Sequence, residues 1–292
     1  MRQRTAIAIG VAAAVALWAA VLLKSDTIRI SDPPPGVGGL SGLAVTGDGA
    51  AFVAISDRNM LIRGEFRREE GRLAGAVVTA TERLRDHAGR VLVGPWNDAE
   101  GLDLTEEGAP VVSFESLPRV LRFDDEARGW PLPDLPPLDL HHANKGFEAL
   151  ALDTQGRAVM VSEIPLRGEE TATILRETPQ GWERFGSLAL DHGFSPTGAD
   201  FGPDGALYVL ERKIGLTGLR SRIRRIRLTG AEAMTGEVVW SPRVGHGNLE
   251  GLSLWTDAAG ALRATMVADD NELPFLPGGF TEIILAKPAP AE

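Results

Sequence analysis

A motif that recurs five times along the chain constrains the fold more than any other feature. Each copy has a short apolar run, a turn that contains glycine, and a second run rich in Val, Ile, Leu and Phe. The copies are "LSGLAVTGDGAAFVAISDR" (Leu40–Arg58), "AEGLDLTEEGAPVVSFES" (Ala99–Ser116), "FEALALDTQGRAVMVSEI" (Phe147–Ile164), "PTGADFGPDGALYVLERK" (Pro196–Lys213) and "LEGLSLWTDAAGALRATMVADDNE" (Leu249–Glu272). Two apolar runs around such a turn predict a β-hairpin.

The spacing of the copies predicts how these hairpins assemble. Equivalent positions in consecutive copies are 59, 48, 49 and 53 residues apart, and the residues between copies fit two further strands. A period of about 50 residues with about four strands is typical of a propeller blade. We therefore expect an all-β fold, a β-propeller with five visible blades, over residues 26–292. The alternative is a β-sandwich whose copies resemble one another by coincidence.

The two ends of this region allow a sixth blade. Thr27–Ser31 and Phe280–Ala286 both have the composition of strands. They are also the natural pair to close the ring, because one comes from each end of the chain. A sixth, degenerate blade would be built from them.

Residues 1–25 differ from the rest of the chain. Arg2 and Arg4 precede an apolar run of 18 residues from Ala6 to Leu23, and Lys24 follows it. This order is typical of an export signal, and the run is just long enough to span a bilayer. We expect either a cleaved signal peptide or a membrane anchor through residues 6–23, with the rest of the chain periplasmic or extracellular. A buried helix of the domain is the third interpretation.

Composition narrows the classes of function. The chain has no cysteine, which excludes disulfides, thiolate metal sites and thiol catalysis. Without residues 1–25 the formal charge is −13. That charge argues against a nucleic acid partner and is compatible with cation binding. We expect a monomer that binds a small molecule.

The repeat places acidic residues at one mouth of the expected channel. In a blade the innermost strand lines the channel and the next strand runs antiparallel, so the start of the first and the end of the second lie at the same mouth. The residues that start the first strands are Ser41, Glu100, Glu148, Thr197 and Glu250. Those that end the second strands are Asp57, Glu115, Glu163, Glu211 and Asp269, with Asp270 beside the last. Together they predict a ring of about eight carboxylates.

Carboxylates gathered in this way repel one another and need compensating cations. Ca²⁺ takes oxygen ligands in flexible geometry, whereas Zn²⁺ prefers His and Cys. We therefore expect a calcium site made by Asp57, Glu100, Glu115, Glu148, Glu163, Glu211, Glu250, Asp269 and Asp270. Flanking amide oxygens could come from Asn97, Asn144, Asn248 and Asn271. The alternative is architectural, with each carboxylate accepting main-chain N–H bonds that pin neighbouring blades together.

Basic residues stand beside the acids. Arg58 follows Asp57, and Arg212 and Lys213 follow Glu211. If the chain bends at the strand ends, these side chains enter the mouth, where they and a metal would bind a phosphate or carboxylate group. Otherwise they are solvated or bridge blades. The chain has no G-x-S-x-G, P-loop or H-E-x-x-H motif.

Four segments carry a resemblance to a known family. They are "GGLSGLAV", "NDAEGLDL", "NKGFEALALD" and "NLEGLSL". Between about Pro33 and Lys287 the chain resembles bacterial phytase-like propellers of the "esterase-like activity of phytase" family. The resemblance implies export, a channel with acidic residues and calcium-dependent hydrolysis of phosphate or other esters. It also implies metal ligands at Glu148, Glu211 and Glu250, and phosphate contacts at Lys145, Arg58, Arg212 and Lys213.

These observations lead to one expected function and two alternatives. We expect an exported calcium-dependent hydrolase of a small anionic ester, with Glu148, Glu211, Arg58, Arg212 and Lys213 as its catalytic residues. The first alternative is a lactonase-like propeller with a single metal ion. The second is a non-catalytic propeller that binds a peptide, sugar or protein at the cell envelope. A propeller fold by itself does not choose among them.

Overall fold

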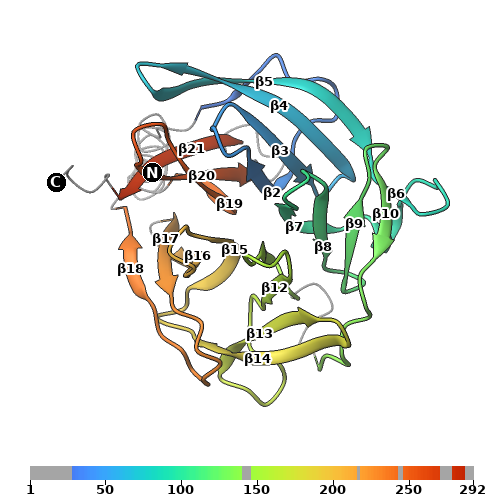
Figure 1. Ribbon diagram of the computed structural model, residues 1–292, viewed down its shortest axis with the longest axis vertical. Coiled ribbons are helices and arrows are strands. Elements are labelled where there is room, and N and C mark those ends of the chain that lie inside the picture. Colours follow the sequence, from blue (N-terminus) through green and yellow to red (C-terminus); the bar gives the residue numbers. More distant parts are fainter. Residues whose placement is uncertain (1–27, 140–145, 216–217, 243–245, 270–277, 287–292) are drawn as a thin grey trace, which may run out of the picture.

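The computed structural model describes residues 28–139, 146–215, 218–242, 246–269 and 278–286. These residues form five sheets around a central channel (Figure 1), which confirms the predicted all-β propeller with five blades. Their helical content is a single turn, η1 (Gly94–Trp96). No helix in the described ranges is long and apolar enough to cross a membrane. The expected signal or anchor, residues 1–25, lies outside those ranges.

Each blade is one sheet whose first long strand faces the channel. Blade 1 contains β2 (Leu40–Val45), β3 (Ala51–Ser56), β4 (Met60–Glu69), β5 (Arg72–Arg83) and, at its outer edge, β1 (Ile30–Ser31). Blade 2 contains β7 (Ala99–Leu104), β8 (Pro110–Phe114), β9 (Arg119–Phe123), β10 (Arg128–Pro131) and the outer β6 (Arg85–Asp86). Blade 3 contains β11 (Ala149–Leu152), β12 (Ala158–Val161), β13 (Thr171–Thr178) and β14 (Gly181–Ala189). Blade 4 contains β15 (Ser195–Phe201), β16 (Leu207–Gly215), β17 (Gly218–Ile226) and β18 (Glu237–Trp240). Blade 5 contains β19 (Asn248–Thr256), β20 (Leu262–Asp269) and β21 (Gly279–Ala286).

The glycines of the repeat form equivalent turns between the first and second strand of every blade. In blade 1 the Gly49 N–H donates to the Thr46 carbonyl at 2.8 Å, and Gly49 has φ +70°. Left-handed φ angles of this kind are strained for residues with a Cβ. The same glycine conformation recurs at Gly108, Gly156, Gly205 and Gly260. The turns therefore explain why each copy of the motif carries its glycine.

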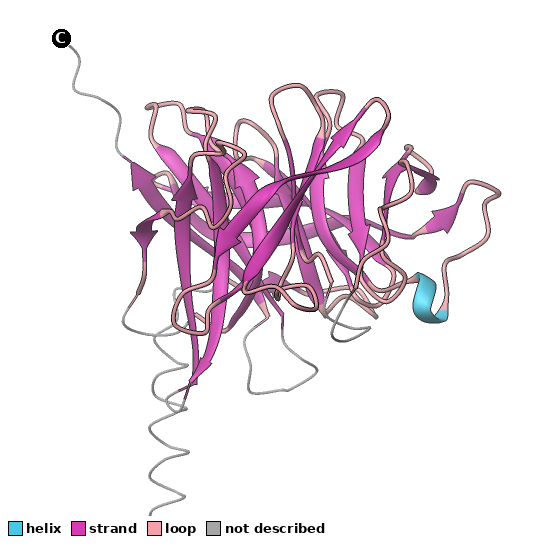
Figure 2. Ribbon diagram, turned by 90° about the horizontal axis from the view of Figure 1, so that it is seen from below, coloured by secondary structure: helices cyan, strands magenta, loops and turns pink. Residues whose placement is uncertain are grey.

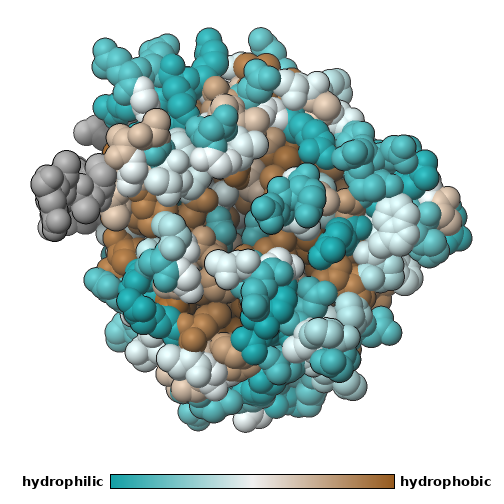
Figure 3. Space-filling view, in the orientation of Figure 1, coloured by the Kyte–Doolittle hydropathy of each residue, from teal (hydrophilic) through white to brown (hydrophobic). Residues whose placement is uncertain are grey.

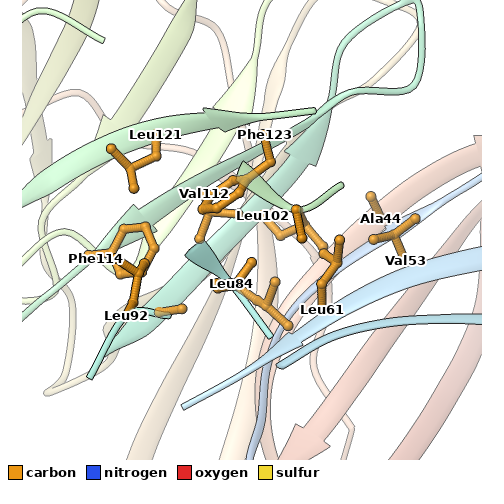
Figure 4. Close-up of a cluster of buried hydrophobic side chains, with 13 residues drawn as sticks. Ala44, Val53, Leu61, Leu84, Leu92, Leu102, Val112, Phe114, Leu121 and Phe123 are labelled. Atoms are coloured by element: carbon orange, nitrogen blue, oxygen red, sulfur yellow. The ribbon is translucent and has the colours of Figure 1, made fainter. Parts of the chain in front are cut away.

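Five hydrophobic clusters fill the spaces between neighbouring blades. Figure 4 shows the cluster between blades 1 and 2, where Leu61 and Val53 of blade 1 pack near Leu102 and Val112 of blade 2. The other four clusters join blades 2 and 3, 3 and 4, 4 and 5, and 5 and 1. Burial of these apolar side chains is the main force that holds the blades together.

The N-terminal segment closes the ring without forming a sixth blade. Ile28 pairs with Phe280 of β21 through two main-chain hydrogen bonds of 2.7 and 2.8 Å. Ile30 and Ser31 then pair with β5 of blade 1. The two ends of the domain do lie side by side, as expected. However, Phe280–Ala286 belongs to the third strand of blade 5, and the described residues form five sheets.

Candidate metal centre at one mouth of the channel

The five inner strands form a narrow ring. β2, β7, β11, β15 and β19 each contact the next strand around the channel. In four blades the residue after the first site position is glycine, and a Cβ there would collide with the next blade. At Gly101 it would lie 2.7 Å from the carbonyl oxygen of Glu148, and at Gly198 it would lie 2.5 Å from that of Glu250. Close packing of the inner strands therefore explains the glycine at this position in blades 1, 2, 4 and 5, while blade 3 carries Ala149 there.

This close packing constricts the channel midway and separates its two mouths. The space at the level of these glycines is about 10 Å³, which is room for roughly one water molecule. Figure 2 shows the sheets edge-on, with loops on both faces and η1 on the lower one. The inner strands start at the η1 face, which we call the acidic mouth, and end at the other face, which we call the turn mouth.

Two of the five first positions join neighbouring blades at the acidic mouth. The Ser41 hydroxyl donates to the Ala99 carbonyl at 2.7 Å, and the Thr197 hydroxyl donates to the Leu249 carbonyl at 3.2 Å. Each contact links one blade to the next. Ser41 and Thr197 thus have an architectural role, by donation to a carbonyl and not by the N–H acceptance expected of the carboxylates.

The carboxylates of blades 2 and 3 gather into one group, which we call the acidic cluster. It consists of two overlapping triads, Asp98–Glu100–Glu115 and Glu115–Glu148–Glu163, each with one oxygen per residue within 4.8 Å of the others. Glu115 and Glu163 are buried, and the N–H of Gly146 donates to Glu115 Oε1 at 2.9 Å. Four of the five members are residues expected from the repeat.

Asp98 was missed by the sequence reasoning. It lies two residues before Glu100, and side chains two apart on an extended strand point to the same side. Asn248 stands in the same relation to Glu250, and its side-chain amide donates to Glu250 Oε1 at 2.6 Å. An oxygen-bearing residue at this position in blades 2 and 5 was the signal available in the sequence.

The electrostatics of the acidic cluster disfavour full ionisation. Burial raises the pKa of Glu100 well above its usual value, and repulsion from Glu148 and other carboxylates adds to the shift. Burial likewise raises the pKa of Glu148, with repulsion mainly from Glu163, while Arg212 acts in the opposite direction. The described residues donate no hydrogen bond to either carboxylate. A bound cation would therefore stabilise the ionised form of both groups.

Blade 5 contributes a second, partly neutralised group. Arg212 Nη1 donates to Glu250 Oε1 at 2.7 Å and also to the side-chain oxygen of Asn248. Burial raises the pKa of Glu250 to about 7, although Arg212 favours its charged form. Asp269 is buried close enough to Glu250 to raise that pKa further. Arg212 thus lies between the carboxylates of blade 5 and those of blade 3.

Glu211 has different surroundings from the acidic cluster. Its fully buried carboxylate accepts hydrogen bonds from Arg222 Nε at 2.6 Å and Arg224 Nε at 2.9 Å, and a further contact from Arg224 Nη2. A carboxylate held by two buried guanidiniums is already compensated. The sequence did not indicate these two arginines, because their position opposite Glu211 depends on the pairing of β16 with β17.

The remaining expected residues lie at the rim or outside the described ranges. Asp57 is half exposed, with Arg58 Nε 3.8 Å from its Oδ1. The Lys213 ammonium contacts the His192 carbonyl, and it lies 5.8 Å from the ring centre of Phe194. Asp270 and Lys145 are outside the described residues.

The donor set of the acidic cluster fits a calcium ion. All of its donors are carboxylate oxygens, the ligand type that hard cations prefer. Two oxygens that bind the same Ca²⁺ at about 2.4 Å lie at most about 5 Å apart, and the oxygens of each triad meet this limit.

Comparison with known proteins places the chain in a family. A family model described as "Phytase-like: Esterase-like activity of phytase" matches residues 35–272. The chain belongs to this phytase-like family. No curated protein matches it.

Solved structures with some likeness to this phytase-like propeller are distant. A gluconolactonase from Xanthomonas campestris is 15% identical, with a TM-score of 0.48, over 91% of this chain and 79% of that one. A protein of unknown function from Dyadobacter fermentans is 12% identical, with a TM-score of 0.47, over 89% and 85%. A virginiamycin B lyase from Staphylococcus aureus is 14% identical, with a TM-score of 0.42, over 90% and 74%. At these values the likenesses assign no function.

Proposed function

We propose that this phytase-like propeller is a calcium-dependent hydrolase of phosphate or other esters, with its active site at the acidic mouth. The observation that carries the proposal is the pair of carboxylate triads that share Glu115. Family membership supports an ester-cleaving activity. The exclusion of thiol chemistry and the lack of a nucleophilic serine motif in the sequence also favour metal-assisted hydrolysis.

The ligands in this proposal are Asp98, Glu100, Glu115, Glu148 and Glu163. When bound, Ca²⁺ would supply a Lewis acid that stabilises negative charge developing on the ester group. The chain's own carboxylates must lose protons before they bind the ion. Because the pKa values of Glu100 and Glu148 are raised, loading the site releases protons, and affinity for the ion rises with pH.

Arg212 and Glu148 have the reactive roles in this arrangement. Both side-chain hydrogen bonds that Arg212 makes to described residues use Nη1. Because a guanidinium has five N–H donors, others can bind the anionic group of a substrate. Glu148 is half-buried beside Glu163, and as a ligand it would help to position the ion against the bound ester. Lys213 and Arg58 serve at the rim as further contacts for an anion. Glu211, held by two arginines, has an architectural role.

Hydrolysis of p-nitrophenyl phosphate, p-nitrophenyl acetate and a γ-lactone, each with Ca²⁺ or with EDTA, tests the proposal. We expect calcium-dependent turnover of the phosphate or the acetate. Glu148→Gln should lower kcat by roughly 10- to 100-fold, because it alters a ligand of the ion, with little change in melting temperature, and Arg212→Ala should mainly raise KM. Glu126→Gln, an exposed acid away from the site, is the control. Calcium binding without turnover of any substrate would contradict the proposal and favour a non-catalytic ligand-binding propeller.

We also propose that residues 1–25 direct export, with Ala6–Leu23 as the apolar segment. Expression of the full chain in a bacterium, followed by fractionation and N-terminal sequencing, tests this. We expect the propeller outside the cytoplasm, either cleaved or bound to the inner membrane. Deletion of residues 6–23 should keep it in the cytoplasm. Full-length chain in the cytosolic fraction would contradict export.

A further inference from the structure

The turn mouth contains a cavity that the proposed hydrolase site does not use. Its volume is about 810 Å³, and its walls come from the first turns of blades 2, 3 and 4. Figure 3 views this face and shows a central hollow with apolar side chains at its bottom and hydrophilic ones around its rim. Cavities of about 300–1,000 Å³ are typical of sites for small organic molecules. The glycine layer separates this cavity from the acidic mouth.

Asp103 and Asp200 line the cavity at equivalent positions of β7 and β15. Asp103 Oδ2 accepts the N–H of Leu152 at 2.6 Å, and Asp200 Oδ2 accepts the N–H of Leu254 at 2.6 Å. Each contact joins one blade to the next. Both carboxylates line the same cavity, and the Asp103 charge raises the pKa of Asp200.

The chain contains its own control for the structural role of this contact. Ser253 occupies the same position in blade 5, and its hydroxyl oxygen accepts the N–H of Val45 in blade 1 at 2.9 Å. Ala44 and Ala151 occupy the position in blades 1 and 3. A neutral hydroxyl therefore makes the same link between blades, and two blades do without it. The charge of the two aspartates goes beyond what the link requires.

The ionised forms of Asp103 and Asp200 are destabilised by their surroundings. Burial raises the pKa of Asp103 to about 6, against two stabilising main-chain hydrogen bonds. Burial raises the pKa of Asp200 well above its usual value, and repulsion from Asp103 adds to the shift. A positively charged group between the two carboxylates would remove this cost.

The rest of the lining also favours a cation. Glu106 and Glu107 add negative charge at the rim, and Asp153 is paired with Arg157. Among the described lining residues, Arg122 is the single basic side chain. Leu152 and Phe201 offer apolar wall to the carbon skeleton of a ligand.

We propose that this cavity is a second binding site, which takes a small organic cation with its ammonium or guanidinium group between Asp103 and Asp200. An organic cation fits better than a metal ion for two reasons. The cavity is far larger than an ion. In the described part of the chain, the compact carboxylate triads lie at the acidic mouth, not here. N–H donors can use the lone pairs that the main chain leaves free on both carboxylates.

Calorimetric titration of the full chain in EDTA with benzylamine and with agmatine tests the proposal, and benzyl alcohol is the neutral probe. We expect at least one amine to bind and the alcohol not to bind. Asp103→Ser with Asp200→Ser keeps the acceptor that Ser253 provides in blade 5 and removes both charges. It should weaken amine binding about tenfold or more. Glu100→Gln with Glu148→Gln should leave amine binding unchanged.

Three results would overturn this inference. The first is that neither amine binds the wild-type chain. The second is that an amine binds the Asp103→Ser, Asp200→Ser variant as tightly as it binds the wild type. The third is that titration with CaCl₂, without an amine, shows one bound calcium ion fewer in that variant than in the wild type, which would make the cavity a metal site. Asp103→Asn with Asp200→Asn, which keeps an acceptor oxygen on each side chain, gives the same readout if the serine variant does not fold. Because the two mouths are separate, none of these results depends on the hydrolase proposal.

Discussion

The two mouths of the channel carry acids on the same strands but use them differently. Glu100 and Asp103 lie three residues apart on β7, one at each mouth. At the acidic mouth, carboxylates from two neighbouring blades approach within 4.8 Å, and Glu100 and Glu148 accept no hydrogen bond from the described residues. At the turn mouth, Asp103 and Asp200 each accept two main-chain N–H bonds beside a large cavity. The first arrangement suits a metal ion, and the second suits a larger cation.

The difference follows from which strands reach each mouth. At the acidic mouth the start of the inner strand meets the end of the second strand, so each blade can supply two carboxylates. At the turn mouth a tight glycine turn joins the same strands, and main-chain N–H groups of the next blade are within reach. Blade geometry therefore places Asp103 and Asp200 within reach of the next blade's backbone, whereas at the acidic mouth Glu115 accepts a main-chain N–H and Glu100 and Glu148 accept none from the described residues.

The largest expected effect on the free energy of unfolding concerns Glu211, an acid outside both the acidic cluster and the turn-mouth cavity. Glu211→Gln removes the charge that compensates Arg222 and Arg224, which are both buried. Loss of one partner of a buried ion pair costs about 3–5 kcal/mol. We expect a loss of that order in the free energy of unfolding, measured by urea denaturation, with unchanged calcium affinity of the folded protein. A stable variant with weakened calcium binding would instead make Glu211 a ligand.

The pH dependence of stability probes the turn mouth. The folded chain keeps a proton on Asp103 up to about pH 6, whereas the unfolded chain loses it near pH 4. The free energy of unfolding therefore falls as pH rises between about 4 and 6, by about 3 kcal/mol or less for this group. Urea titrations in EDTA across this range should show a smaller fall in the Asp103→Ser, Asp200→Ser variant. Identical slopes in the two proteins would contradict the burial of charge at this mouth.

A smaller effect tests the layer that separates the mouths. Gly101→Ala places a methyl group against the main chain at Glu148, and overpacking of this kind costs about 1–3 kcal/mol. Because Glu148 belongs to the acidic cluster, calcium binding should weaken while amine binding at the turn mouth persists. Gly47→Ala, where a methyl group meets open space, is the matched control for melting temperature and calorimetry. Equal behaviour of the two variants would show that the ring tolerates a wider spacing.

The sequence predicted the blades well because a propeller repeats its local pattern. Glycine turns and alternating apolar runs recur in every copy, so the number of copies in the sequence gives the number of blades. The gathering of Glu100, Glu115, Glu148 and Glu163 follows from the same repeat, since strand starts and ends are fixed within each blade. Their roles as ligands stay a prediction.

The repeated motif does not predict contacts made by strands that lie outside it. Arg222 and Arg224 reach Glu211 through the register of β16 with β17, which no repeat signal encodes. Asp103 and Asp200 lie inside the motif, but they recur in two blades of five and so resembled ordinary variation. The narrowness of the channel depends on how closely the five inner strands pack, which is a property of the folded ring and not of any one repeat.

Calcium titration by calorimetry, after removal of bound ions with EDTA, tests the central claim most directly. We predict that the wild-type chain binds calcium. Glu115→Gln alters the carboxylate shared by both triads. It should weaken calcium binding by at least the roughly 10- to 100-fold caused by changing residues that only hydrogen-bond to metal ligands. The Asp103→Ser, Asp200→Ser variant should bind calcium as wild type does. No calcium binding by the wild-type chain, or equal affinity in the Glu115→Gln variant, would contradict a metal site at the acidic mouth.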